Sequence, residues 1–132
     1  MSLQQAVHQM WGDDLDLNTL VTVARVFTGR AVDNPTLPYA VLARHQSIPS
    51  IHTSSDTRID QTSLRINIWT TDLDNGKEIA GELIRLFDSA AFDLVDGKVL
   101  NMRHQLTTEE IQHDGTWRVA VDFTAIAQYL SM

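Results

Sequence analysis

The sequence predicts an α+β fold in which a mostly antiparallel β-sheet packs against a central amphipathic helix, with a short N-terminal helix and a C-terminal β-hairpin. Two stretches, 64–69 and 117–124, alternate apolar and polar residues with the period of a half-buried strand. Between them, residues 76–87 repeat apolar residues at helical spacing. A regular strand–helix–strand alternation is absent, which argues against a doubly wound parallel sheet. The length of 132 residues predicts one domain over residues 1–132.

Two short helices are expected near the start of the sequence. Residues 3–11 carry an apolar stripe at spacings of three and four, and Gly12 ends this helix. A second short helix is expected to reach Val21. Residues 23–27 fit either a strand or the end of that helix, and residues 29–35 fit a loop because they contain Gly, Asp, Asn and Pro.

Two strands separated by a polar segment are expected next. Alternating residues from Pro38 onward predict a strand of about eight residues with both faces fairly apolar. Residues 48–60 are rich in Ser, Thr and Asp and contain Pro49, so we expect a long exposed loop or a mobile arm there. The clearest half-buried strand follows, in which Leu64, Ile66 and Ile68 alternate with Arg65, Asn67 and Trp69.

The central helix and a terminal hairpin complete the predicted fold. Asp74 or Asn75 is expected to cap the helix. Its apolar stripe consists of Ile79, Ala80, Leu83, Leu86 and Phe87. Residues 99–111 and 116–127 are expected to form two antiparallel strands joined through His113-Asp114-Gly115. Asp-Gly is a favoured hairpin turn because both central positions can take positive φ.

The composition excludes several classes of protein. The net charge of −7 and the ten scattered basic residues argue against a nucleic-acid-binding groove, which concentrates Lys and Arg. Without cysteine there is no disulfide framework, which is compatible with a reducing cytoplasm. No apolar run approaches the roughly 18 residues of a membrane helix. The first residues also lack the basic region and apolar block of a secretory signal.

The residue patterns predict no catalytic, metal or cofactor site. The five histidines lie in five different predicted elements, and only His104 and His113 are placed to approach each other, across the final hairpin. Asp72 and Asp74 are expected to end a strand and cap the helix rather than to form an acid–base pair. Neither a glycine-flanked serine elbow nor a glycine-rich phosphate loop occurs, so no catalytic residue and no cofactor is predicted.

Trp69 has two interpretations at this point. It alternates away from the apolar face of its strand. Either both faces of the strand are covered, or Trp69 marks a contact surface, where an aromatic side chain buries much area for little loss of rotamer entropy.

The order of these segments resembles a known family. The run Leu-Pro-Tyr-Ala-Val-Leu at 37–42, the strand at 64–71 and the helix at 76–87, with Ala80 facing inward, resemble the tail-completion, tail-terminator-like and head–tail joining proteins of tailed bacteriophages and prophages. That family opens with a short helix and places a Pro-Tyr strand after a loop. An alternating strand, a helix and a terminal hairpin follow. The resemblance covers residues 15–127.

The resemblance implies a structural assembly subunit that is not an enzyme. It implies a homo-oligomeric ring that completes the tail and docks the head, with tail-tube or connector proteins as partners. DNA is expected to pass through without specific binding, and no membrane contact is implied. The implied location is the cytoplasm during assembly and the virion of a phage-derived particle.

A ring of this kind needs an interface in which one surface of a subunit meets a different surface of the next. We expect the polar arm at 48–60 to become ordered on assembly. An acidic wall suits a DNA channel, because like charge keeps DNA from sticking, and the net charge of −7 fits it. The interface candidates are Trp69, Ile48, Ile51, His52, Asp56 and Arg58.

Two further functions stay open at this point. One is a small-molecule-binding or catalytic α+β barrel that encloses an apolar cavity. Its pocket candidates are His104, Trp117, Asp122 and Tyr129. The other is a homodimeric interaction module.

Overall fold

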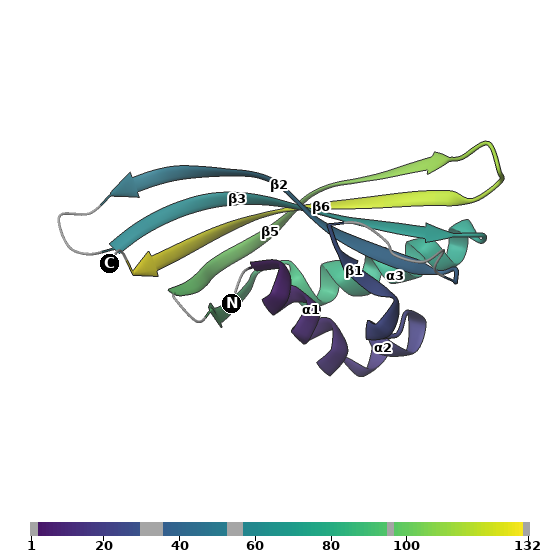
Figure 1. Cartoon of the computed structure of the whole chain (residues 1–132), viewed down its shortest axis with the longest axis horizontal. Coiled ribbons are helices and arrows are strands. Elements are labelled where there is room, and N and C mark those ends of the chain that lie inside the picture. Colours follow the sequence, from purple (N-terminus) through teal and green to yellow (C-terminus); the bar gives the residue numbers. More distant parts are fainter. Residues whose placement is uncertain (1–2, 30–35, 53–56, 95–96, 131–132) are drawn as a thin grey trace.

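The fold is a six-stranded, strongly twisted sheet with helices on one face, which confirms the predicted α+β class (Figure 1). The computed structural model describes residues 3–29, 36–52, 57–94 and 97–130, with the backbone alone at residues 44–52, 57 and 130. The elements in chain order are α1 (Leu3–Asp13), α2 (Leu15–Leu20), the 3-10 turn η1 (Val23–Arg25), β1 (Val26–Thr28), β2 (Tyr39–His52), β3 (Thr57–Thr70), α3 (Leu73–Phe87), β4 (Ala90–Leu94), β5 (Gly97–Ile111) and β6 (Trp117–Leu130).

The strands lie in the order β1-β2-β3-β6-β5-β4. The short β1 runs parallel to β2, and every other neighbouring pair is antiparallel. Four long strands, β2, β3, β6 and β5, cross the whole molecule side by side (Figure 1). β1 and β4 are short and lie at the two outer edges of the sheet.

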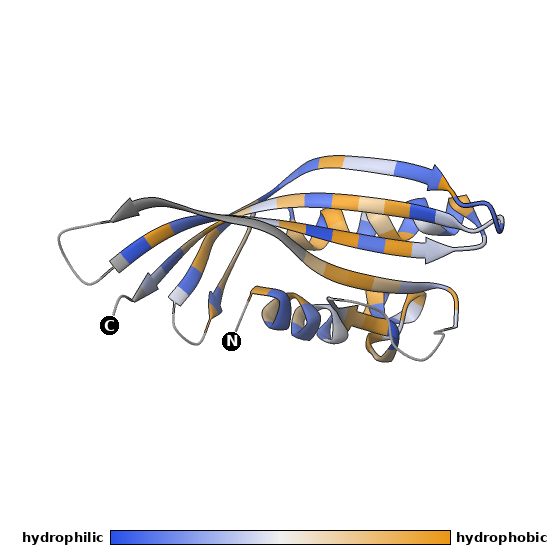
Figure 2. Cartoon of the chain, turned by 45° about the horizontal axis from the view of Figure 1, so that its top comes forward, coloured by the Kyte–Doolittle hydropathy of each residue, from blue (hydrophilic) through white to orange (hydrophobic). Residues whose placement is uncertain are grey.

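The core lies between the helices and one face of the long strands. Leu64, Ile66 and Ile68 of β3 are fully buried there, as the alternation predicts. The apolar stripe of α3 packs against the same face, and Phe87 meets Phe123 of β6 edge-on, with ring centroids 6.1 Å apart. Figure 2 shows the alternation of hydrophobic and hydrophilic residues along the strands.

The start of α3 differs from the prediction by two residues. Asp72 is the N-cap, and its carboxylate accepts a hydrogen bond from the Asp74 backbone N–H at 3.0 Å. Capping by Asp74 or Asn75 is therefore wrong, because both residues already lie inside the helix. Of the two residues expected to end the strand and cap the helix, Asp72 is the cap, whereas Asp74 lies in the first turn of α3 and β3 already ends at Thr70.

Gly76 permits the close approach of α3 to the sheet. A Cβ at this position would lie 2.9 Å from Cγ2 of Val119 and 3.0 Å from Cγ2 of Thr70. We expect Gly76→Ala to lower the free energy of unfolding by about 1 kcal/mol, because the overpacking exceeds the helix propensity gained. Gly81 lies on the exposed side of the same helix, where an added Cβ would meet no atom within 4 Å, so Gly81→Ala should be stabilising by about 0.5–1 kcal/mol. Urea denaturation measures both changes, and equal stability of the two variants would contradict this packing.

Residues 48–60 are mostly strand, so the expected loop or arm is wrong over 48–52 and 57–60. These segments belong to β2 and β3, and Pro49 is paired opposite Asp60. Residues 53–56 lie outside the described residues. The physical reason is that this part of β2 is an edge of the sheet, where proline and polar residues are tolerated.

Three other details go beyond or correct the predicted order. Residues 23–27 are divided between η1 and the short strand β1, and β4 is not among the predicted strands.

The hairpin turn is also longer than an Asp-Gly two-residue turn. The Gly115 N–H donates to the Gln112 carbonyl at 3.0 Å, and the Gln112 N–H donates to the Thr116 carbonyl at 2.7 Å. Gly115 takes positive φ and Asp114 does not, which is typical of a type I turn followed by a bulge.

Candidate functional site

The surface available for contacts is the sheet face opposite the helices, here called the open face. On β3 it carries the residues that alternate with the buried ones, including Trp69 and Arg65. Trp69 is half-buried and therefore does not belong to the helix-covered core. Of the two interpretations of Trp69, coverage by the helices does not apply, and the contact surface stays a prediction.

Three aromatic side chains line one end of the open face. Tyr39 of β2 stacks on Trp69 of β3, with ring centroids 5.2 Å apart and ring planes at 17°. Phe27 of β1 meets Tyr39 edge-on at 6.2 Å. The stacking follows from the register, which pairs Tyr39 directly with Trp69. An offset stack of this kind contributes about 0.5–1.5 kcal/mol beyond the area buried.

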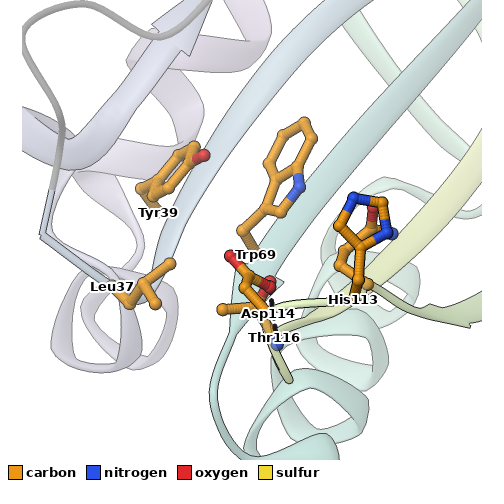
Figure 3. A pocket seen from close by; sticks show the side chains of 7 residues that line it. Leu37, Tyr39, Trp69, His113, Asp114 and Thr116 are labelled. Carbon is orange, nitrogen blue, oxygen red and sulfur yellow. Dashed lines mark hydrogen bonds between the residues drawn. The ribbon is translucent and has the colours of Figure 1, made fainter.

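The stacked pair forms one wall of a surface hollow of about 430 Å³. The loop of the β5–β6 hairpin forms the opposite wall, and Figure 3 shows His113 and Asp114 facing the two aromatic rings. The residues that line the hollow are Leu37, Tyr39, Trp69, Gln112, His113, Asp114 and Thr116.

The surroundings of Asp114 and Tyr39 in this hollow shift the pKa values of both groups. The Thr116 hydroxyl and backbone N–H donate to the Asp114 carboxylate at 2.7 and 3.0 Å and lower its pKa. Burial, and secondarily the charge of Asp114, raise the pKa of Tyr39. At neutral pH the hollow therefore presents an anionic carboxylate and a neutral phenol, an arrangement that suits binding rather than proton transfer.

Two acidic groups on the open face, Asp122 and Glu110, pair with arginine. Arg65 donates to Asp122 through Nε at 2.7 Å and through a second nitrogen at 3.1 Å, and this hydrogen bonding raises the pKa of Arg65. Arg118 likewise reaches Glu110 at 3.3 Å. The described open-face side chains include four basic residues and three acidic ones, namely Arg65, Lys98, Arg103 and Arg118 against Asp93, Asp122 and Glu110. The open face is therefore not the acidic wall that the net charge suggests.

Both edges of the sheet are covered along only part of their length. β1 pairs with β2 at Ala40–Leu42, and β4 pairs with β5 between Gly97 and Met102. Residues 43–52 of β2 and 105–111 of β5 have no neighbouring strand on their outer side within the described residues. We call these segments the β2 free edge and the β5 free edge; they lie at opposite ends of the sheet (Figure 1).

The structure does not gather the predicted interface residues into one cluster. Trp69 lies on the open face, whereas Arg58, on the same strand, lies on the opposite face. Arg58 Nε lies 3.1 Å from Asp60 Oδ2, and its guanidinium lies 5.2 Å from the centre of the Tyr129 ring. The backbones of Ile48, Ile51 and His52 belong to the β2 free edge, and Asp56 lies outside the described residues.

Other features of the surface are not predicted from the sequence. Tyr39 as the partner of Trp69, the hairpin loop as a wall of the hollow and the two free edges all depend on strand pairing. The sequence does contain a signal for Tyr39, since it alternates with buried residues in the same way as Trp69.

The residues proposed for a barrel pocket do not converge. Asp122 lies on the open face, whereas His104, Trp117 and Tyr129 lie on the helix side, spread along β5 and β6. The pocket interpretation of these four residues is therefore wrong.

His104 also does not approach His113. It pairs with Phe123, well away from the hairpin loop, and its Nε2 lies 2.7 Å from the Thr107 hydroxyl. Over the described ranges, no group of three His, Cys, Asp or Glu side chains is arranged to hold a metal ion. None of the helices in those ranges is long and apolar enough to span a membrane.

Comparisons with known proteins agree with this architecture. A chain from the virion of a native gene transfer agent particle has the same fold, with a TM-score of 0.77 and 16% sequence identity. The match covers 96% of this chain and 95% of that one. Among curated protein sequences no match is found. The family model described as tail completion protein gp17 matches residues 5–128, which confirms the resemblance; the chain belongs to this family of phage tail structural proteins.

Proposed function

We propose that this chain is the subunit of an oligomeric ring that completes the end of a phage tail and docks the head. The observation that carries the proposal is the family match over residues 5–128. The fold shared with a chain from a gene transfer agent virion supports a place in the particle. The partners are then tail-tube or connector proteins, with assembly in the cytoplasm and a final location in the virion.

The surface of the chain fits a structural role of this kind. A ring requires two different surfaces per subunit, each facing one neighbour. The free edges of β2 and β5 are two such surfaces, because they lie at opposite ends of the sheet (Figure 1). DNA passing through the ring would not be bound specifically, since the described arginines of the open face include two that are held by carboxylates, Arg65 and Arg118.

Deletion of the gene from the strain that produces the particle tests this function. We expect electron microscopy to show separate heads and tails in place of joined particles, and expression of the unaltered chain to restore joining. Light scattering of the purified protein over a wide concentration range would then report a ring-sized species, alone or with tail tubes. Joined particles of normal appearance in the deletion strain would contradict the proposed function.

A further inference from the structure

The outer backbone groups of β5 are free towards the end of the strand. The Gln112 N–H donates to the Thr116 carbonyl across the hairpin. In an antiparallel pair every second residue directs its backbone N–H and C=O groups at the neighbouring strand, so Glu110 and Thr108 direct theirs at β6. The residues between them, Thr107, Glu109 and Ile111, direct their N–H and C=O groups outward. Earlier in β5 the outward-facing backbone groups are hydrogen-bonded within the chain: the Met102 carbonyl accepts from the Ser89 N–H, and the His104 N–H donates to the Asp88 carboxylate.

On β2 too, every second residue directs its backbone N–H and C=O groups away from the sheet. The Leu42 carbonyl accepts a hydrogen bond from Gly29 and therefore faces away from β3. After the register shift between Arg44 and Gln46, the outward row continues through Ser47 and Pro49. Pro49 has no N–H to donate, and an outward position is where a strand tolerates proline without losing a ladder hydrogen bond. The strand register and the presence of proline therefore both indicate that the backbone of residue 49 faces away from β3.

The directions of the two strands allow the two free edges of neighbouring copies to pair. Three antiparallel steps separate β2 from β5 in the sheet, so the two strands run in opposite directions. A second copy that presents its β2 free edge to the β5 free edge therefore adds an antiparallel strand and keeps the open face on the same side. Antiparallel addition of this kind satisfies backbone groups on both strands.

The side-chain composition of the free edges is complementary as well. Residues 43–52 contain Arg44, His45 and His52 and no acidic residue, whereas residues 105–111 contain Glu109 and Glu110 and no basic residue. Glu109 and Glu110 also have partners within the chain, at 3.9 Å from Lys77 and 3.3 Å from Arg118, but both carboxylates are exposed enough to meet a second cation. Opposite charges across strands favour one register and one partner.

We propose that successive subunits are joined by antiparallel pairing of the β5 free edge of one copy with the β2 free edge of the next. This inference rests on the proposed ring and names the contact that builds it. Within one chain Thr108 pairs with Ala120, Ala120 with Asn67 and Asn67 with Val41, so Thr108 and Val41 lie at the same height along the strands. Pairing with the middle of the β2 free edge displaces the next copy by about six residues, or about 20 Å, along the strands. Each subunit then makes two different contacts, as a ring requires, and the ring closes where the rotation between neighbours adds up to a full turn.

Proline at an outward position of β5 tests the pairing. Glu109→Pro removes an N–H that faces away from β6, so the hairpin within the subunit is kept. Glu109→Ala is the matched control, because it also removes the carboxylate near Lys77. Glu109→Ala keeps the outward N–H and the Glu110 carboxylate, so we expect it to enter rings and particles with a much smaller loss than Glu109→Pro. Glu109→Pro should fold with the same circular dichroism spectrum, yet each contact should weaken about tenfold, or about 1.4 kcal/mol.

Cysteine cross-linking gives a second readout in the assembled particle. The chain has no cysteine of its own, so any disulfide between two copies of it comes from the introduced residues. We would combine Ser47→Cys in turn with Thr107→Cys, Glu109→Cys and Ile111→Cys, express each in the deletion strain and oxidise the purified particles. A ladder of linked subunits is expected from one or more pairs, and none of the four single variants should give a ladder.

The outcomes separate the contact from the function. Particles that contain the protein, give no ladder with any pair and accept Glu109→Pro as readily as Glu109→Ala would overturn the edge pairing and leave the ring intact. Cross-links from the β2 free edge to a different tail protein would also overturn it. Normal joined particles in the deletion strain would instead remove the proposed function itself.

Discussion

Trp11→Ala is expected to lower the free energy of unfolding by about 3–5 kcal/mol, the range for removing a buried Trp or Phe side chain. Trp11, near the end of α1, is the largest fully buried side chain of the described residues, and it belongs to the hydrophobic core cluster. Its Nε1 donates to the Val21 carbonyl at 2.9 Å, so the substitution also leaves a buried acceptor without its donor. Urea denaturation followed by circular dichroism measures the change.

Trp11→Phe separates the two contributions. It keeps an aromatic ring in the core but removes the hydrogen bond to Val21. We expect it to cost about 1–3 kcal/mol, less than Trp11→Ala, because only part of the volume is lost. A Trp11→Ala variant within about 1 kcal/mol of the unaltered chain would show that α1 does not belong to the cooperative core.

Gly97→Ala is expected to lower the free energy of unfolding by about 2–3 kcal/mol, because the new methyl group meets backbone rather than a movable side chain. A Cβ at Gly97 would overlap the carbonyl oxygen of Gln128 and would lie 3.0 Å from Cα of Tyr129. β5 must therefore shift away from β6 at this point, and β4, which pairs with the same part of β5, must shift with it.

Lys98→Ala is the matched control for this substitution. Lys98 is the next residue of β5 and is exposed, so its replacement by alanine is expected to change the stability by less than about 0.5 kcal/mol. Thermal denaturation of both variants under the same conditions gives the comparison. Equal melting temperatures for Gly97→Ala and Lys98→Ala would mean that β5 and β6 do not approach as closely as described.

Much of the fold follows from local patterns in the sequence. The alternation around Leu64 and Ile66 identifies the buried face of β3, and the helical stripe ending at Phe87 identifies the buried face of α3. Both patterns are predictive because one face of each element is in the core and the other is not. The C-terminal hairpin is predicted in the same way, although the predicted type of its turn is wrong.

The length of the long strands is not predictable in this way. Beyond Arg44, β2 is an edge strand whose residues include Ser, His and Pro, so its sequence matches that of a loop. The register shifts at Arg44 and Pro49 also interrupt the alternation on which the prediction depends. β4 has only five residues, which is too short for a pattern to be distinguished from a loop.

The candidate site depends even more on pairing between distant segments. The alternation identifies Trp69 as a residue that faces away from the apolar side of its strand, yet its partner Tyr39 is thirty residues earlier in the sequence. The free edges are defined by which strands end early, which is a property of the whole sheet. Local periodicity identifies the faces of a strand but carries no information on its neighbours.

The two register shifts and Pro49 on the outer side of β2 have a consequence for the order of assembly events. They shorten the run of evenly spaced hydrogen-bonding groups on this edge, so under the proposed edge pairing two copies that meet in solution would form few bonds and separate quickly. In a closed ring every subunit is held from both sides, and release of one copy requires two contacts to break at once. For the proposed ring, the same interruptions would make incomplete oligomers short-lived while allowing the completed ring to persist, so that closure would be cooperative.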